Sequence, residues 1–144
     1  MSRAVVDASA LARLVLRGEG AAELANLLAA KTLVMAPYLV CGETANTLWK
    51  YVRAQQLDRD EAVVRLGEAL ALVDELVEDS ELAAEALVAA SGAGHPVYDM
   101  LYAVLARRHG CPVITTDRPL AELLQAMEIL VEIPNGVGED GGAG

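Results

Sequence analysis

Hydrophobic positions along this chain follow two patterns that alternate. Short apolar runs rich in Val, Ile and Leu are typical of buried strands, whereas apolar residues three and four positions apart predict helices. The short runs predict strands at 3–6, 32–37, 75–78, 111–116 and 128–133. The helical spacing predicts helices at 8–18, 21–30, 38–56, 58–73, 80–94, 95–110 and 117–126.

Because strands alternate with helices almost throughout, the sequence predicts an α/β fold. Its centre is expected to be a mostly parallel sheet of about five strands, with helices covering both faces. The pattern places one domain at residues 1–134. Residues 135–144 are acidic and rich in glycine, a composition that predicts a disordered tail.

The charge of the chain narrows the possible functions. Its net charge is −10, which argues against a protein that coats nucleic acid, because such proteins need a basic face. Any contact with nucleic acid is therefore expected to be local. The candidate cations for it are Lys50, Arg53, Arg107, Arg108 and Arg118.

The sequence also bears on location. No charge-free apolar run approaches the roughly 18 residues of a membrane span. Asp7, Arg13 and Arg17 interrupt what would be the apolar part of a signal peptide. We therefore expect a cytoplasmic protein that does not associate with membranes.

Two acids directly follow predicted strands. Asp7 comes after the run AVV, and Asp117 comes after VITT. In a parallel sheet, ligands bind at the carboxyl ends of the strands, so these carboxylates would share one crevice if their strands are neighbours. Each acid is also a good N-cap for the helix that follows it. The two roles are compatible, because one oxygen can cap while the other binds a ligand.

Two more acids stand in apolar surroundings. Glu43 lies within YLVCGETANTL, with Asn46 on the same helix face, and Asp99 lies in the first turn of YDMLYAVLARRHG. Taken singly, Glu43 is explained by a place at a helix rim and Asp99 by the helix dipole. Four such acids are harder to explain together. If they converge, a hard divalent cation such as Mg²⁺ or Mn²⁺ would offset their repulsion and activate water for attack on a phosphodiester.

Other residue patterns that often mark a functional site do not indicate one here. The chain has neither G-x-x-x-x-G-K-[ST] nor G-x-G-x-x-G, and its two histidines and two cysteines lack the paired spacing of zinc ligands. Tyr98 and Tyr102 lie about one helical turn apart and are typical of a core or an interface.

Three segments resemble the motifs of the PIN-domain ribonucleases, and within them the VapC-like toxins of toxin–antitoxin pairs. VVDASAL is similar to the first motif and GETANTL to the second. YDMLYAVLARRHGCPVITTDRPL is similar to the third and fourth motifs read together. The resemblance extends from about Val5 to Ile133.

This resemblance implies a three-layer α/β/α sandwich and a Mg²⁺- or Mn²⁺-dependent endoribonuclease that leaves a 5′-phosphate and a 3′-hydroxyl. It further implies a homodimer and a cognate antitoxin that blocks the site. The implied catalytic and metal-binding acids are Asp7, Glu43, Asp99 and Asp117. The implied supporting residues, which would orient those acids by hydrogen bonds, are Ser9, Asn46 and Thr115.

Two alternatives stay open at this point. The chain could be a non-catalytic docking or regulatory module with the same fold, although the presence of all four acids weakens that hypothesis. It could also be a housekeeping nuclease, directed at RNA or DNA, that has the same site but no antitoxin.

Overall fold

A parallel sheet lies at the centre of the computed structural model, which describes residues 2–134. The order of its strands is β3-β2-β1-β4-β5. Their bounds are Arg3–Val6 for β1, Leu33–Pro37 for β2, Glu75–Val77 for β3, Val113–Ile114 for β4 and Val131–Glu132 for β5. The predicted tail at 135–144 lies outside the described residues.

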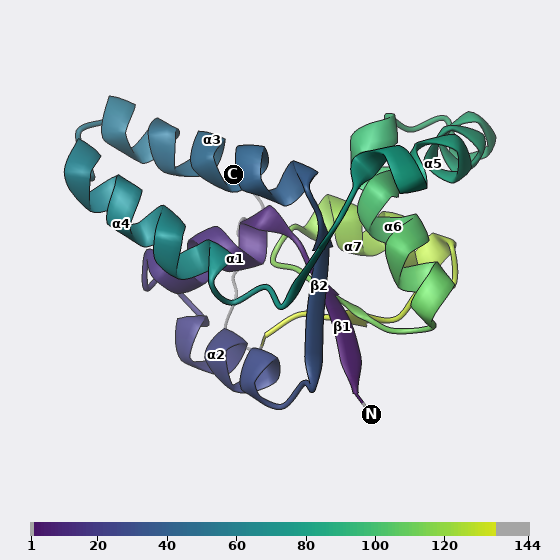
Figure 1. Ribbon diagram of the computed structural model, residues 1–144, viewed down its shortest axis with the longest axis horizontal. Helices are drawn as coiled ribbons and strands as arrows, with labels where there is room; N and C mark the ends of the chain where they lie inside the picture. The colour runs from purple at the N-terminus through teal and green to yellow at the C-terminus, as the bar shows by residue number, and fades with distance from the viewer. Residues whose placement is uncertain (1, 135–144) are drawn as a thin grey trace.

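Helices cover both faces of this sheet. Figure 1 shows α1 to α4 on one side and α5 to α7 on the other. Their bounds are Ala8–Val15 for α1, Ala21–Ala29 for α2, Leu39–Arg53 for α3, Arg59–Leu70 for α4, Asp79–Ala93 for α5, Val97–His109 for α6 and Arg118–Ala126 for α7. The predicted three-layer α/β/α architecture with a parallel, five-stranded sheet is therefore confirmed for the described residues.

The helix α6 is apolar over most of its length because it is buried on nearly all sides. Every residue from Met100 to Ala106 is buried. This helix packs against β1, β2 and β4 on one side and against α5 on the other, so little of its circumference meets water. Asp99, just before this buried run, lies where α6 begins at the carboxyl edge of the sheet.

Two predicted strands are shorter than expected. The run 111–116 pairs as a strand only at Val113–Ile114. At its start the Cys111 N–H donates to the Ala106 carbonyl (3.1 Å), and at its end the Thr116 N–H donates to the Ser9 hydroxyl (3.0 Å). The run 128–133 pairs only at Val131–Glu132. Glu128 has a positive φ of 61°, and its N–H donates back to Gln125, so the turn that ends α7 takes up the start of this run.

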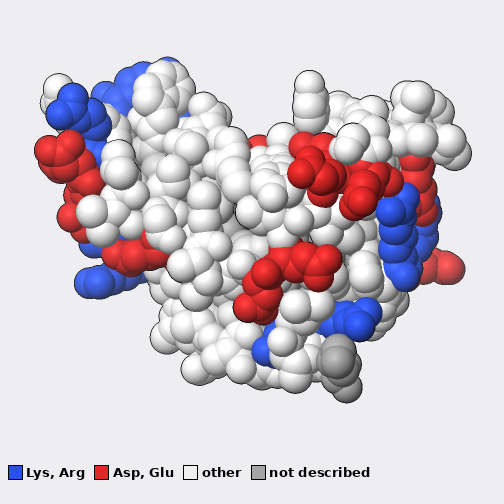
Figure 2. Space-filling view, in the orientation of Figure 1, with Lys and Arg blue, Asp and Glu red and all other residues white. Residues whose placement is uncertain are grey.

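The distribution of charged side chains on the surface reflects the excess of acidic over basic residues. On the face shown in Figure 2, acidic side chains lie over the middle and also at the left and right edges, where basic side chains lie beside them. Arg107 and Arg108 both pair with Glu85, at 3.2 and 2.9 Å. None of the helices within residues 2–134 has the length and apolar character needed to cross a membrane.

Candidate active site

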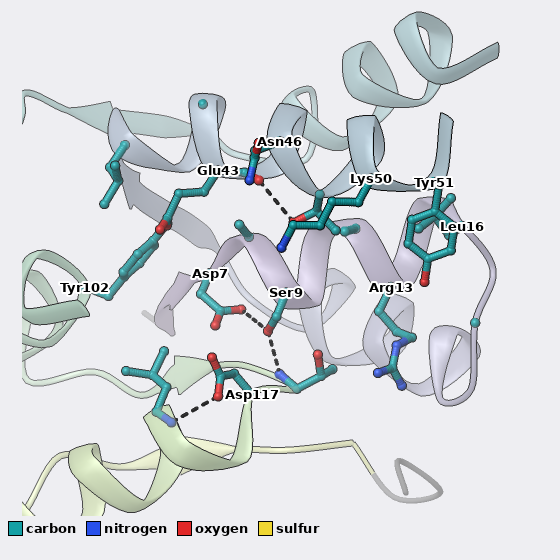
Figure 3. A pocket seen from close by; sticks show the side chains of 18 of the residues that line it. Asp7, Ser9, Arg13, Leu16, Glu43, Asn46, Lys50, Tyr51, Tyr102 and Asp117 are labelled. Carbon is teal, nitrogen blue, oxygen red and sulfur yellow. Dashed lines mark hydrogen bonds between the residues drawn. The ribbon is translucent and has the colours of Figure 1, made fainter. Parts of the chain in front are cut away.

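The four acids lie on one cavity at the carboxyl edge of the sheet. β1 and β4 are direct neighbours, with Val6 paired to Ile114, so the residues that follow these strands emerge side by side. The cavity has a volume of about 790 Å³. Its lining includes Asp7, Glu43, Asp99 and Asp117. Three of these acids are visible in Figure 3, on three different elements around the cavity.

Asp7 is the most buried and the most firmly held of the four. Only 4% of the residue is exposed. It is the N-cap of α1: its Oδ1 accepts hydrogen bonds from the Ala10 N–H (3.0 Å) and from the Ser9 hydroxyl (2.7 Å). Its Oδ2 accepts a hydrogen bond from the Thr115 hydroxyl (2.5 Å). These contacts fix the orientation of the carboxylate at the base of the cavity.

Asp117 is joined to Asp7 through Thr115. The Thr115 hydroxyl, which donates to Asp7, accepts a hydrogen bond from the Asp117 N–H (2.9 Å). The side chain of Asp117 caps α7 by accepting from the Leu120 N–H (3.2 Å). Both acids that follow strands therefore cap a helix and also line the cavity.

Glu43 extends from α3 toward α6. Its Oε1 accepts a hydrogen bond of 2.6 Å from the hydroxyl of Tyr102, whose side chain is buried between the sheet and the cavity. Figure 3 shows the two side chains meeting at this contact. The Tyr102 hydroxyl on α6 thus holds the Glu43 carboxylate on α3, a helix that covers the other face of the sheet.

Asp99 stands in the first turn of α6 and pairs with a histidine. Its Oδ2 lies 2.8 Å from Nε2 of His95, four residues earlier. Asp99 is also three residues before Tyr102, so both side chains lie on one face of α6. That face therefore contributes one acid to the cavity and positions a second one.

The electrostatics show how closely the four acids lie. Burial raises the pKa of Asp7 to about 6, against the hydrogen bonds from Thr115, Ala10 and Ser9, and the charge of Asp117 adds to the rise. Burial also raises the pKa of Glu43, with contributions from the charges of Asp99 and Asp117. The pKa of Asp117 is raised by burial and by the charge of Asp99. Each acid thus interacts with at least one other through space.

The supporting residues divide into two groups. Ser9 and Thr115 hydrogen-bond to Asp7, and to each other at 3.2 Å. Asn46 also lines the cavity, but within residues 2–134 it makes no hydrogen bond to the acids. The hydroxyl of Thr116 is buried at the cavity and likewise has no protein partner among the described residues. A buried hydroxyl without a partner is costly, which makes it a natural contact for a ligand or its water shell.

The chemistry of these donors fits a hard divalent cation, which prefers carboxylate, hydroxyl and water oxygens. Their positions are looser than a finished coordination shell: within residues 2–134 no three His, Cys, Asp or Glu side chains stand close enough together to hold a metal ion. Two of the acids are instead held by neighbouring side chains: Glu43 accepts a hydrogen bond from Tyr102, and Asp99 pairs with His95.

Sequence reasoning did not assign His95 or Tyr102 to the site. For Tyr102 the spacing was the available signal, because a residue three positions after Asp99 shares its helix face, whereas His95 precedes the helix. Tyr102 was predicted as a core or interface residue, and it is indeed buried. What the spacing does not reveal is that its hydroxyl reaches Glu43, which is 59 residues away in the sequence.

Comparison with known proteins identifies the family to which the chain is similar. The PIN domain family matches residues 4–123. The chain is 34% identical over 125 residues to "Ribonuclease VapC3" of Pyrobaculum aerophilum, covering 85% of this chain and 95% of that protein.

Two solved structures are similar in fold. The crystal structure of PAE2754 from Pyrobaculum aerophilum superposes with a TM-score of 0.67 at 28% identity, over 88% of this chain and 90% of that one. VapBC2 from Rickettsia felis, bound to a DNA fragment from its promoter, superposes with a TM-score of 0.64 at 12% identity. That match covers 91% of this chain and 98% of the other.

Proposed function

This chain belongs to the PIN-domain family, and on that premise we propose that it is a Mg²⁺- or Mn²⁺-dependent endoribonuclease that acts as the toxin of a toxin–antitoxin pair. The observation that carries the proposal is the gathering of Asp7, Glu43, Asp99 and Asp117 on one cavity. Burial and like charges raise the pKa values of Asp7, Glu43 and Asp117, which is costly for the fold alone and suits a site that binds a cation.

The roles of the residues follow from their contacts. Asp7, Glu43, Asp99 and Asp117 would hold the divalent ion. When bound, the ion supplies an activated water and neutralises charge on the phosphodiester. Asp7 and Asp117 are fixed through Thr115 and through their helix caps, so they define the rigid side of the site. Glu43 and Asp99 approach from α3 and α6, and Tyr102 and His95 set where these two carboxylates point.

The test is cleavage of RNA by the purified chain with Mg²⁺ or Mn²⁺, with and without a chelator. We expect cleavage that the chelator stops and that Asp99→Asn abolishes. Equal activity in Asp99→Asn protein would identify a contaminating nuclease and contradict the proposal. A calorimetric titration with Mn²⁺ that shows no acid-dependent binding would favour the non-catalytic docking module instead.

The proposed antitoxin would block the same cavity. An arginine or lysine side chain from a partner would form charge-assisted hydrogen bonds with the clustered carboxylates. The relative from Rickettsia felis was solved as the VapBC2 complex on promoter DNA, which supports a partner of this kind. We expect a small protein encoded beside this gene to co-purify with the chain and to inhibit cleavage. Co-purification without inhibition would contradict this part of the proposal.

The proposed homodimer rests on exposed apolar side chains. Leu87 and Val88 on α5 are 59% and 73% exposed, and Tyr98 at the start of α6 is 65% exposed. Large exposed apolar groups on two helices that pack together are typical of an interface. Sedimentation at micromolar concentration is expected to show a dimer that Val88→Lys weakens. A monomer for the unchanged chain would contradict the prediction.

A further inference from the structure

The cavity continues well beyond the four acids. α1 and α3 pack side by side, and both begin at the end that carries the acids and run away from it (Figure 3). The cavity follows them, so its lining also includes Arg13, Leu16, Thr47, Lys50, Tyr51 and Gln56. Lys50 is seven residues after Glu43, about two helical turns farther along α3. One end of the cavity is therefore acidic. Arg13, Lys50 and Tyr51 make the other end basic and aromatic, and from there the Lys50 side chain extends back toward Ser9 (Figure 3).

Lys50 is placed differently from the other lysine of the chain. Lys31 forms an ion pair with Glu132 at 2.7 Å. Lys50 is half-buried and, within residues 2–134, has neither an ion pair nor a hydrogen bond. In a chain with a net charge of −10, this cation extends into a cavity without being neutralised there (Figure 3).

The neighbours of Lys50 complete a surface for a nucleotide. The ring of Tyr51 lines the cavity and is 38% exposed, so one face can receive a base. The guanidinium of Arg13 is anchored nearby by a hydrogen bond from Nη1 to the Glu19 carbonyl (3.1 Å). A cation for a phosphate and an aromatic ring for a base are the two elements from which single-strand binding sites are built.

We propose that this basic end is a subsite for single-stranded RNA. Lys50 contacts a backbone phosphate that flanks the cleaved one, and Tyr51 packs against the adjoining base. The inference rests on the proposed nuclease function and adds the position of the substrate strand. A cavity of about 790 Å³ suits one or two nucleotides with exposed bases better than a double helix.

The experiment compares Lys50→Gln with Arg53→Gln in the full chain. Both remove one positive charge from α3, but Arg53 stacks on Trp49 at 4.6 Å and does not line the cavity. We expect Lys50→Gln to raise the KM for a short single-stranded RNA roughly 10-fold, with kcat changed less than about twofold. Its affinity for Mn²⁺, measured by electron paramagnetic resonance without RNA, should not change. Arg53→Gln should leave all three quantities near those of the unchanged chain.

The dependence of RNA binding on salt gives a second readout. Fluorescence anisotropy in a chelator measures binding of the same RNA without cleavage. When a protein neutralises one phosphate fewer on single-stranded RNA, the slope of log K against log salt falls by about 0.7 in magnitude, which we expect for Lys50→Gln alone. This measurement also keeps the two proposals separate: RNA that binds through Lys50 but is never cut would contradict the nuclease and leave the subsite standing.

Three results would overturn the subsite. The first is an equal effect of Lys50→Gln and Arg53→Gln, which would show only a general loss of charge. The second is a weaker affinity for Mn²⁺ in Lys50→Gln, which would place Lys50 in the metal site. The third is unchanged RNA binding in Lys50→Gln.

Tyr51 is tested by its ring. Tyr51→Phe keeps a flat aromatic face and is expected to bind RNA as the unchanged chain does. Tyr51→Leu is expected to weaken binding by roughly 5-fold or more, because the variant has no aromatic ring on which a base can stack. Equal binding by the two variants would contradict the assigned role of Tyr51.

Discussion

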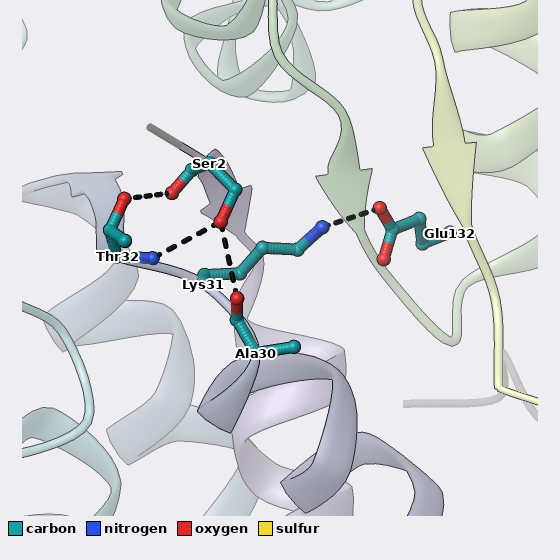
Figure 4. A network of polar contacts seen from close by, with 5 residues as sticks. All are labelled: Ser2, Ala30, Lys31, Thr32 and Glu132. Atoms are coloured by element: carbon teal, nitrogen blue, oxygen red, sulfur yellow. Dashed lines mark hydrogen bonds and ion pairs between the residues drawn. The ribbon is translucent and has the colours of Figure 1, made fainter.

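At the amino end of the central sheet the polar groups pair with one another, whereas at the carboxyl end like charges lie together. Near the start of β1 and β2, the Thr32 hydroxyl donates to the Ser2 carbonyl (2.6 Å), and the Ser2 hydroxyl donates to the Ala30 carbonyl (3.1 Å). Lys31 there pairs with Glu132 at 2.7 Å (Figure 4). At the carboxyl end, by contrast, four carboxylates share one cavity.

The contrast between the two ends of the sheet indicates that the amino end contributes to stability and the carboxyl end to function. At the amino end, each charge or hydrogen-bonding group in the network has a partner of opposite character, so the network ties the start of the sheet together. At the carboxyl end, burial and like charges raise the pKa values of Asp7, Glu43 and Asp117. An arrangement that costs folding free energy is expected where a ligand offsets the cost.

The largest expected effect comes from removing one charge at the carboxyl end. Asp7→Asn keeps a side chain that caps helices well, so α1 should retain its N-cap. We expect RNA cleavage to fall by more than about 100-fold, because loss of a residue that only orients a metal ligand already costs roughly 10- to 100-fold. Urea unfolding at pH 7 should show no loss of stability, since a buried charge is removed. Activity near that of the unchanged chain would show that the carboxyl end is not the active site.

A smaller effect is expected from the phenol that positions Glu43. Tyr102→Phe removes the hydrogen bond to Glu43 but keeps the ring in the core. We expect the half-saturating concentration of Mn²⁺, measured by electron paramagnetic resonance, to rise roughly 10-fold, with activity recovering at high Mn²⁺.

The matched control is Tyr98→Phe, the same change on the same helix at a residue that is 65% exposed. It should have no effect on Mn²⁺ binding. If Tyr102→Phe lowers only the free energy of unfolding and leaves Mn²⁺ binding unchanged, Tyr102 is a core residue and nothing more.

The raised pKa of Asp7 gives a prediction for stability without metal. The pKa is about 6 in the folded protein and near 3.8 in the unfolded chain, so the folded state binds the proton more tightly between these values. The contribution of Asp7 to stability is therefore fully present below about pH 4 and is lost as the pH rises to about 6. The loss is on the order of 3 kcal/mol.

Urea unfolding in a chelator from pH 4 to 7 measures this loss. The control is Asp7→Asn, whose profile over the same range should be flatter. Equal profiles for the two proteins would show that Asp7 does not have a raised pKa.

The smallest effect is expected at the amino end. Lys31→Met removes the ion pair with Glu132. The Lys31 side chain is 14% exposed and the Glu132 side chain is 28% exposed. We expect a loss of about 1 kcal/mol or less in the free energy of unfolding and no change in RNA cleavage. Reduced cleavage by a folded Lys31→Met protein would contradict the separation of roles between the two ends.

Much of this architecture could be predicted from the sequence because its causes are local. Apolar periodicity placed the strands and helices to within a few residues, since burial and helix capping depend on near neighbours in the chain. The positions of Asp7 directly after β1 and of Asp117 three residues after β4 had the same local origin. Two strands were exceptions. In β4 the Thr116 N–H donates to Ser9, which is 107 residues away, and the start of the β5 run is taken up by the turn that ends α7.

The sequence by itself thus determined the alternation of strands and helices and the acids that follow two strands. Only the tertiary structure decided that β1 and β4 are neighbours, and hence that Asp7 and Asp117 share Thr115. It also decided that Tyr102 reaches Glu43 and that Lys50 extends into the same cavity. These contacts depend on how distant segments cross the sheet, and no local propensity specifies that crossing.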